Sequence, residues 1–221
     1  MGDDPQTAMD DFDSIWERMY SEGRMLNRYP YDMVVSLTFR YFGSVRDKSS
    51  VKVLDLGSGA GNNALFFAQE GFDITALEPS QSALDYAKKR FSDMRVKGKF
   101  LRMSFLQLNR LIETYDLILD RQSLCVMGIA EIRKILPTIL DRMHEKSLFF
   151  SFFYTSDYPD MAYCESKGSF TTLDQRTLME VFAGFEMTRL YKHETLPIIG
   201  GTENSLGKSE WIVVGKKRKT T

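Results

Sequence analysis

A glycine-rich stretch that follows a carboxylate is the part of this sequence whose residue types and spacing best fit ligand chemistry. It runs Asp55-Leu-Gly57-Ser-Gly59-Ala-Gly61 and stands between a predicted strand and a predicted helix. Glycines let the backbone approach a ligand closely, and such a turn delivers the ligand to a helix N-terminus. Seventeen residues beyond Gly61, Glu78 ends the next predicted strand. An acid at that place can accept hydrogen bonds from both ribose hydroxyls of an adenosine, so we expect an adenosine-containing ligand.

The detailed spacing of the turn distinguishes two classes of adenosine ligand. A dinucleotide site needs GxGxxG, whereas this chain has GxGxG, with Asn62 where the dinucleotide pattern has its third glycine. The Asp55 carboxylate would repel a pyrophosphate but suits a ligand with an amino group and a sulfonium cation. This favours S-adenosylmethionine. An NAD-dependent oxidoreductase and a non-catalytic S-adenosylmethionine-binding subunit are the two alternatives.

Alternating strands and helices must position this turn. Two helices, 11–21 and 31–42, are predicted first. The predicted strands that follow are 51–56, 73–78, 100–103, 115–120 and 147–154, and the predicted helices are 62–70, 81–91, 129–144 and 173–182. Such alternation predicts a parallel sheet covered on both faces. Two last strand-like runs, 186–192 and 210–215, have no helix between them, so we expect them to be antiparallel.

With these motifs in place, the chain resembles the class I (Rossmann-like) S-adenosylmethionine-dependent methyltransferases over residues 51–215. The resemblance implies an α/β fold: a mostly parallel seven-stranded sheet with an antiparallel last strand and helices on both faces. It also implies a helical N-terminal lid over 1–45, within a single domain spanning 1–221. The activity that it implies is transfer of a methyl group from S-adenosylmethionine, with S-adenosylhomocysteine as the product.

The resemblance further implies which residues hold the cofactor. In chain order they are Asp55, Gly57, Ser58, Gly59, Gly61, Glu78, Pro79, Ser80, Ser104, Phe105 and Asp120. The glycine turn would wrap the methionine part, with Asp55 orienting its amino group, and Glu78 would hold the ribose. Ser104 stands where the family often has an acid for the adenine amino group, and Phe105 would cover the ring. Asp120 matches the family's motif after the fourth strand.

A short stretch suggests the class of acceptor. Residues 120–124, Asp-Arg-Gln-Ser-Leu, are similar to the Asp-Arg-x-x-Leu stretch of thiopurine- and tellurite-type methyltransferases, which act on small molecules. Arg121 can bind an anionic acceptor as a fork, or it can form a structural ion pair with Asp120 or Asp116. The other expected substrate contacts are Arg28, Tyr29 and Tyr154. An aromatic turn around Tyr29, together with Trp16 and Tyr20, could form a lid that excludes water.

A general base is needed only for an acceptor that is protonated at neutral pH. The chain has two histidines, His144 and His193. His144 is expected near the end of a helix, in a capping or exposed role. His193 is expected to follow the sixth strand and to open a loop, and it is the candidate base. The expected catalytic residues are therefore His193 and Arg121.

Composition excludes several classes of partner. The net charge is −1, from 29 basic and 30 acidic residues, so no broad phosphate-binding face and no nucleic-acid substrate are expected. Two cysteines, Cys125 and Cys164, without a CxxC pattern, predict neither a disulfide framework nor a metal site. The longest apolar runs are too short for a membrane span, and the acidic N-terminus does not resemble a targeting signal. We therefore expect a cytoplasmic protein, while the oligomeric state is not predicted.

Overall fold

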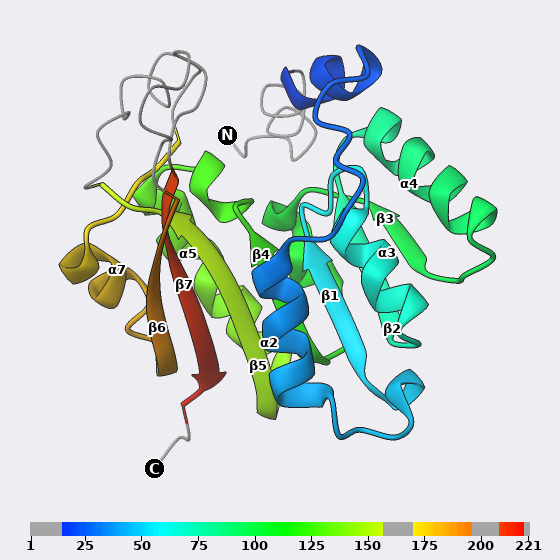
Figure 1. The fold of residues 1–221 in the computed structure, drawn as a ribbon. Helices are drawn as coiled ribbons and strands as arrows, with labels where there is room; N and C mark the ends of the chain where they lie inside the picture. The colour runs from blue at the N-terminus through cyan, green and yellow to red at the C-terminus, as the bar shows by residue number, and fades with distance from the viewer. Residues whose placement is uncertain (1–14, 157–169, 196–207, 219–221) are drawn as a thin grey trace. The chain divides into compact units, whose positions relative to one another are not determined.

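The computed structural model describes residues 15–156, 170–195 and 208–218, and it has the expected fold class (Figure 1). Its strands form one mixed sheet in the order β3-β2-β1-β4-β5-β7-β6. The strands are β1 (Lys52–Leu56), β2 (Asp73–Glu78), β3 (Lys99–Arg102), β4 (Tyr115–Arg121), β5 (Met143–Tyr154), β6 (Phe185–Thr195) and β7 (Lys208–Lys217). The helices are α2 (Asp32–Phe42), α3 (Asn62–Gln69), α4 (Gln81–Asp93), α5 (Ile129–Asp141) and α7 (Gln175–Val181). Residues 15–21, which belong to the predicted first helix, are helical.

The chain divides into two compact units, Met1–Leu117 and Ile118–Thr221, with the boundary inside β4. A single domain over 1–221 and an N-terminal lid over 1–45 remain predictions, and residues 1–14 lie outside the described residues. No helix in the described parts of the chain is long and apolar enough to cross a membrane.

Unit 1 is built on three parallel strands. β1 pairs with β2, and β2 pairs with β3, each in parallel. β1 and β2 are buried from their second residue onward, and α3 and α4 pack against the strands of this unit. α2 packs on α3 through Phe39 and Phe66, whose ring centroids are 6.1 Å apart. Ser80 is the N-cap of α4, and its hydroxyl accepts a hydrogen bond from the amide of Ala83.

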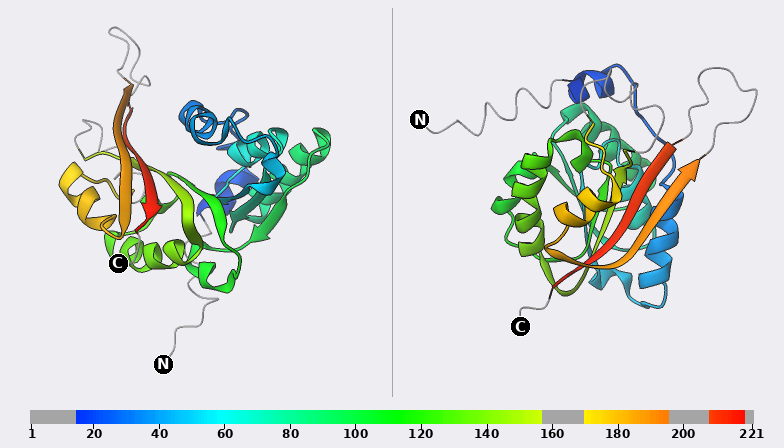
Figure 2. Two further views of the ribbon diagram at one scale, coloured as in Figure 1. Left: turned by 90° about the horizontal axis from the view of Figure 1, so that it is seen from below. Right: turned by 90° about the vertical axis from the view of Figure 1, so that its left-hand side faces the viewer.

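Unit 2 ends in antiparallel strands. β7 pairs antiparallel with β5 on one side and with β6 on the other, so the expectation of an antiparallel finish is confirmed. Figure 2 shows β6 and β7 side by side. The rings of Phe149, Phe182 and Phe185 stack between β5, α7 and β6, with the centroids of Phe149 and Phe185 5.0 Å apart.

The structure corrects the position of both histidines. α5 ends at Asp141, because the chain turns at Arg142, whose backbone amide donates to the carbonyls of Ile139 and Leu140. His144 therefore lies in β5 and not in a helix. β6 extends beyond Lys192 because His193 pairs with Glu210 and Glu194 pairs with Ser209 of β7. The polar residues after Lys192 are typical of a loop, but cross-strand backbone pairing continues through them. His193 is therefore a strand residue.

Candidate functional site

The glycine turn of unit 1 has the backbone shape that a ligand cradle needs. Gly59 and Gly61 adopt φ values of +52° and +72°, which L side chains rarely tolerate. Gly61 is the N-cap of α3, and its amide donates to the carbonyl of Ser58 at 3.0 Å. The amide of Ser58 donates to the carbonyl of Leu77 in β2, also at 3.0 Å. The turn is thereby tied to the end of the neighbouring strand.

Glu78 connects this turn to the start of α4. Its side chain is buried, with one oxygen accepting from the amide of Gly59 at 2.8 Å and the other from the amide of Ser80 at 3.0 Å. A carboxylate oxygen has two acceptor sites, so both oxygens can also accept from a ligand. The sequence placed Glu78 at the end of the second strand, and the structure brings it against the turn as well.

Two further polar groups of the turn are buried. Asp55 lies in β1 and is 1% exposed, and Ser58 is 5% exposed. Among the described residues, the Ser58 hydroxyl has no hydrogen-bond partner. An unsatisfied buried hydroxyl costs about 1–3 kcal/mol, and a polar ligand atom would remove that cost. The turn therefore fits a ligand with polar groups.

Tyr20 lies over the turn. A Cβ built at Gly59 would overlap the hydroxyl of Tyr20, so these two residues are in close contact. Burial, with the nearby carboxylates of Glu78 and Asp55, raises the pKa of Tyr20 well above its ordinary value. The hydroxyl is therefore neutral and able to donate. The sequence suggested Tyr20 as part of a lid together with Trp16, but no local signal indicates its contact with Gly59.

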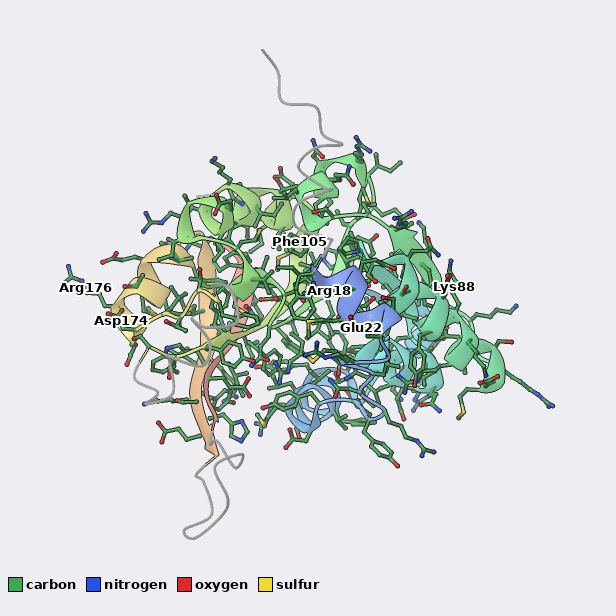
Figure 3. All side chains as sticks on the ribbon, turned by 90° about the horizontal axis from the view of Figure 1, so that it is seen from above. Arg18, Glu22, Lys88, Phe105, Asp174 and Arg176 are labelled. Atoms are coloured by element: carbon green, nitrogen blue, oxygen red, sulfur yellow. The ribbon has the colours of Figure 1, made fainter. Side chains whose placement is uncertain are left out.

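Glu17, a residue that sequence reasoning did not assign, joins the same helical segment to α4. It accepts from the hydroxyl of Ser80 at 2.7 Å and from the amide and hydroxyl of Ser82 at 3.2 and 2.5 Å. Burial opposes ionisation, but these donors together lower the pKa of Glu17 below its ordinary value. Figure 3 shows Arg18 and Glu22 on this N-terminal segment and Lys88 on α4. The segment is therefore attached at the edge of the predicted adenine site.

The residues expected around the adenine are already engaged within unit 1. Ser104 is the N-cap of a short 3₁₀ helix, Phe105–Arg110, and its hydroxyl accepts from the amide of Leu106 at 3.3 Å. Phe105, labelled in Figure 3, is buried. The carbonyl of Pro79 accepts from Arg102 Nε at 3.4 Å. Adenine contacts by Ser104 and Phe105 remain predictions.

Arg28 and Tyr29 point outward from a backbone that is held in place. The side-chain Nδ2 of Asn62 donates to the carbonyl of Tyr29 at 3.0 Å. The Arg90 guanidinium donates to the backbone carbonyls of Arg28, Asn27 (3.2 Å) and Ala60 (3.1 Å). The Arg28 guanidinium lies 5.5 Å from the centroid of the Tyr29 ring, and Tyr29 is 73% exposed. Their role in substrate binding remains a prediction. Sequence reasoning missed Arg90, because an arginine at this place in a helix is indistinguishable from an ordinary surface residue.

In unit 2, Asp120 shapes the turn after β4. It is fully buried, and one oxygen accepts from the amides of Ser123 and Leu124, both at 2.9 Å. The other oxygen accepts from the hydroxyl of Ser151 at 2.6 Å. Burial raises the pKa of Asp120 to about 6, although these hydrogen bonds act in the opposite direction. Its carboxylate is thus engaged by the chain itself, and a contact with the cofactor remains a prediction.

Glu210, which sequence reasoning did not assign, is the centre of a second polar cluster in unit 2. Arg121 Nη1 lies 3.8 Å from Glu210 Oε2, so the described ion pair of Arg121 differs from the expected pairs with Asp120 or Asp116. His193 Nδ1 lies 3.2 Å from Glu210 Oε1. Gln122 Nε2 donates to Glu210 Oε2 at 3.0 Å, and Tyr154 OH donates to Gln122 Oε1 at 2.9 Å. The structure thus brings together Arg121, Tyr154 and His193 around a buried acid.

No group of three or more His, Cys, Asp or Glu side chains that could hold a metal ion occurs within the described ranges.

A family model described as "Methyltransferase domain" matches residues 53–145, which include the glycine turn, Glu78 and Asp120. A protein of Geobacillus sp. (strain WCH70), named as a methyltransferase, is 26% identical over 89 residues, covering 40% of this chain and 36% of that protein. Hemagglutinin 1 of Eikenella corrodens is 27% identical over 154 residues, covering 66% of this chain and 47% of that protein. The chain thus spans less than half the length of either relative.

Among solved structures, the chain is similar to 1,6-didemethyltoxoflavin-N1-methyltransferase of Burkholderia thailandensis. The TM-score is 0.74 at 15% identity, covering 99% of this chain and 92% of that one. That structure contains 1,6-didemethyltoxoflavin and S-adenosylhomocysteine. At this identity, the similarity shows a shared fold.

Proposed function

We propose that this chain, part of which matches a methyltransferase domain, is a class I S-adenosylmethionine-dependent methyltransferase that transfers the cofactor's methyl group to a small molecule. The observation that carries the proposal is the buried Glu78 carboxylate, held by the amides of Gly59 and Ser80 beside a left-handed glycine turn. S-adenosylmethionine, when bound, supplies a methyl group on a sulfonium ion with a neutral thioether as leaving group. A small acceptor is supported by the acceptor of the Burkholderia enzyme and by the balanced charge of the chain.

The residues of unit 1 can serve each part of the cofactor. The Asp55 carboxylate can accept from the amino group of the methionine part, and the Ser58 hydroxyl can donate to its carboxylate. Gly57, Gly59 and Gly61 form the turn around it. Glu78 can accept from the ribose hydroxyls, because each carboxylate oxygen has two acceptor sites. Around the adenine we propose Pro79, Ser80, Ser104 and Phe105, with Asp120 contributing from β4.

The contribution of the protein to methyl transfer is mostly alignment and exclusion of water. Holding two reactants in the right geometry can lower the barrier by about 7–11 kcal/mol. Tyr20, buried and neutral, covers the turn and limits the access of water. On the acceptor side we propose Arg28, Tyr29, Tyr154 and Arg121, with Arg121 as an anchor for an anionic group. His193 is the proposed base.

Glu78→Ala tests the cofactor site. The variant loses charge-assisted hydrogen bonds to the ribose, each worth about 1.5–3 kcal/mol, so we expect the affinity for S-adenosylhomocysteine to fall roughly 10- to 150-fold. Isothermal titration calorimetry measures this fall, and thermal unfolding checks that the variant is folded. Glu113→Ala is the control, because Glu113 is an exposed acid of the same unit that pairs with Lys99. Equal affinities of the two variants would remove Glu78 from the site.

A further inference from the structure

Glu210 is a buried acid in contact with a more accessible histidine. Its side chain is 4% exposed, whereas that of His193 is 36% exposed, and the two face each other across β6 and β7. Glu210 Oε1 lies 3.2 Å from His193 Nδ1, and the other oxygen accepts from Gln122 Nε2 at 3.0 Å. The Glu210 carboxylate thus contacts Gln122 through one oxygen and His193 through the other, and the imidazole is the more exposed of these two partners.

This contact sets the tautomer of His193. A carboxylate can only accept a hydrogen bond, so Nδ1 carries the hydrogen and the lone pair of the neutral ring is on Nε2. His144 has the opposite arrangement, because the amide of Lys146 donates to His144 Nδ1 at 3.2 Å. The lone pair that is engaged is then on Nδ1, and the hydrogen is on Nε2. The two histidines of the chain are thus predicted to differ in tautomer.

The residues around Glu210 keep its orientation fixed. Gln122 has a φ of +59°, a left-handed conformation that costs a residue with a side chain about 1–2 kcal/mol. Its amide is nevertheless held at both ends, by Tyr154 OH at 2.9 Å and by Glu210. Strained residues of this kind persist where their surroundings over-determine them, and they concentrate at functional sites.

Three strands of unit 2 carry charged side chains in or next to the cluster around Glu210 and His193. Arg121, at the end of β4, lies 3.8 Å from the Glu210 oxygen that faces Gln122, and its guanidinium is 5.5 Å from the centroid of the Phe152 ring. On β6, Lys192 pairs with Glu194 at 2.7 Å. Glu210 on β7 is the carboxylate in contact with the imidazole.

We propose that Glu210 is the positioning residue of a Glu210–His193 pair, and that the acceptor is a compound with a hydroxyl group at the reacting atom. Resting on the proposed function, the step is as follows. The acceptor O–H bond breaks, His193 Nε2 takes the proton, and the oxygen keeps the electron pair. That oxygen forms the bond to the methyl carbon, the C–S electron pair stays on sulfur, and the imidazolium later releases its proton to water.

Nitrogen NMR of the protein labelled with ¹⁵N-histidine tests the pair without requiring activity. We expect two neutral imidazoles in opposite tautomers, with the Nδ1–H form assigned to His193 by its loss in His193→Gln. Glu210→Leu should remove the preference for Nδ1–H, whereas Glu210→Gln should keep it, because the amide oxygen still accepts. His144 should be unchanged in both. The proposed Glu210–His193 pair is wrong if His193 has the same tautomer as His144, or if Glu210→Leu is folded but leaves the tautomer of His193 unchanged.

Transfer of labelled methyl to 3,4-dihydroxybenzoate and to 4-mercaptobenzoate tests the hydroxyl assignment. We expect transfer to the hydroxyl compound, reduced about 10²- to 10⁴-fold in His193→Gln, the range of general-base effects. Glu194→Gln, an exposed acid on β6, is the control and should match the unmodified protein.

Each failure has its own meaning. Transfer to the thiol alone or to neither compound, or equal rates for His193→Gln and the unmodified protein, overturns the hydroxyl assignment. The proposed function fails separately, if the unmodified protein does not bind S-adenosylhomocysteine.

Discussion

At Gly59 the backbone adopts a left-handed conformation, and the hydroxyl of Tyr20 lies where a side chain would begin. The glycine is therefore required twice, for its φ and for the space above it. Spacing alone indicated the first requirement, because the GxGxG pattern follows a strand. The second comes from Tyr20, a residue 39 positions earlier in the chain.

Gly59→Ala separates these two requirements when it is compared with Gly71→Ala. Both glycines have positive φ, so both substitutions cost about 1–2 kcal/mol of backbone strain. A Cβ at Gly71 meets no atom within 4 Å, whereas at Gly59 it displaces Tyr20. We expect Gly59→Ala to lower the affinity for S-adenosylhomocysteine at least tenfold, measured by calorimetry, and Gly71→Ala to leave it unchanged. An equal loss in both would mean that strain, and not the contact at the turn, controls binding.

Asp120 should make the protein less stable as the pH rises. Its pKa is about 3.8 in the unfolded chain and is raised by burial to about 6 in the folded one. Its stabilising contribution is therefore complete below pH 3.8 and is lost as the pH rises through 6, by up to about 3 kcal/mol. Asn at this position can still accept from Ser123 and Leu124 and can donate to Ser151, without titrating.

Urea unfolding of Asp120→Asn at pH 4, 5, 6 and 7 measures this effect. We expect the free energy of unfolding of the unmodified protein, relative to the variant, to fall as the pH rises over this range. Asp141→Asn changes an exposed acid at the end of α5, and its free energy of unfolding should differ from that of the unmodified protein by the same amount at every pH. A constant difference between Asp120→Asn and the unmodified protein would contradict the raised pKa of Asp120.

Among the elements, α4 is the one whose beginning combines a local and a distant signal. Ser80 is an N-cap that its residue type predicts, because a serine hydroxyl satisfies a free amide of the first turn. Glu17 reaches the same cap from the N-terminal segment, and nothing in the spacing of the two residues indicates that contact. The end of β6 shows the same division, because cross-strand pairing with β7 extends β6 beyond the apolar pattern.

A double-mutant cycle of Ser80→Ala and Glu17→Ala measures the connection between this segment and α4. Ser80→Ala removes the cap and should cost about 1 kcal/mol. Because the Ser80 hydroxyl donates to Glu17 at 2.7 Å, the two substitutions should couple by about 0.5–1.5 kcal/mol in urea unfolding. Glu22→Ala, an exposed residue that pairs with Arg24 at 3.6 Å, should not couple with Ser80→Ala. Additive effects of Ser80→Ala and Glu17→Ala would show that the segment is not attached through this contact.

For the molecule as a whole, ligand-dependent unfolding tests both the cofactor and the single domain. A ligand at a hundred times its dissociation constant stabilises by about 2.7 kcal/mol, which raises the midpoint by roughly 5–10 °C at this size. We expect this rise with S-adenosylhomocysteine, in one cooperative transition. NAD and NADH should produce no rise. A rise with NAD or NADH alone would indicate an oxidoreductase, and two transitions of which one responds would show that the units unfold separately.

Short-range patterns in the sequence determined the fold class and the ligand-binding turn. Strand and helix periodicity, turn chemistry and an acid at a strand end depend on residues within about twenty positions, so they can be read without coordinates. The tertiary structure decided which side chains meet beyond that range. Gln122 contacts Glu210 across 88 positions, and Tyr20 covers Gly59. Even the nearer pair of His193 and Glu210 depends on the register of two strands, where a slip of one residue would turn the side chains to opposite faces.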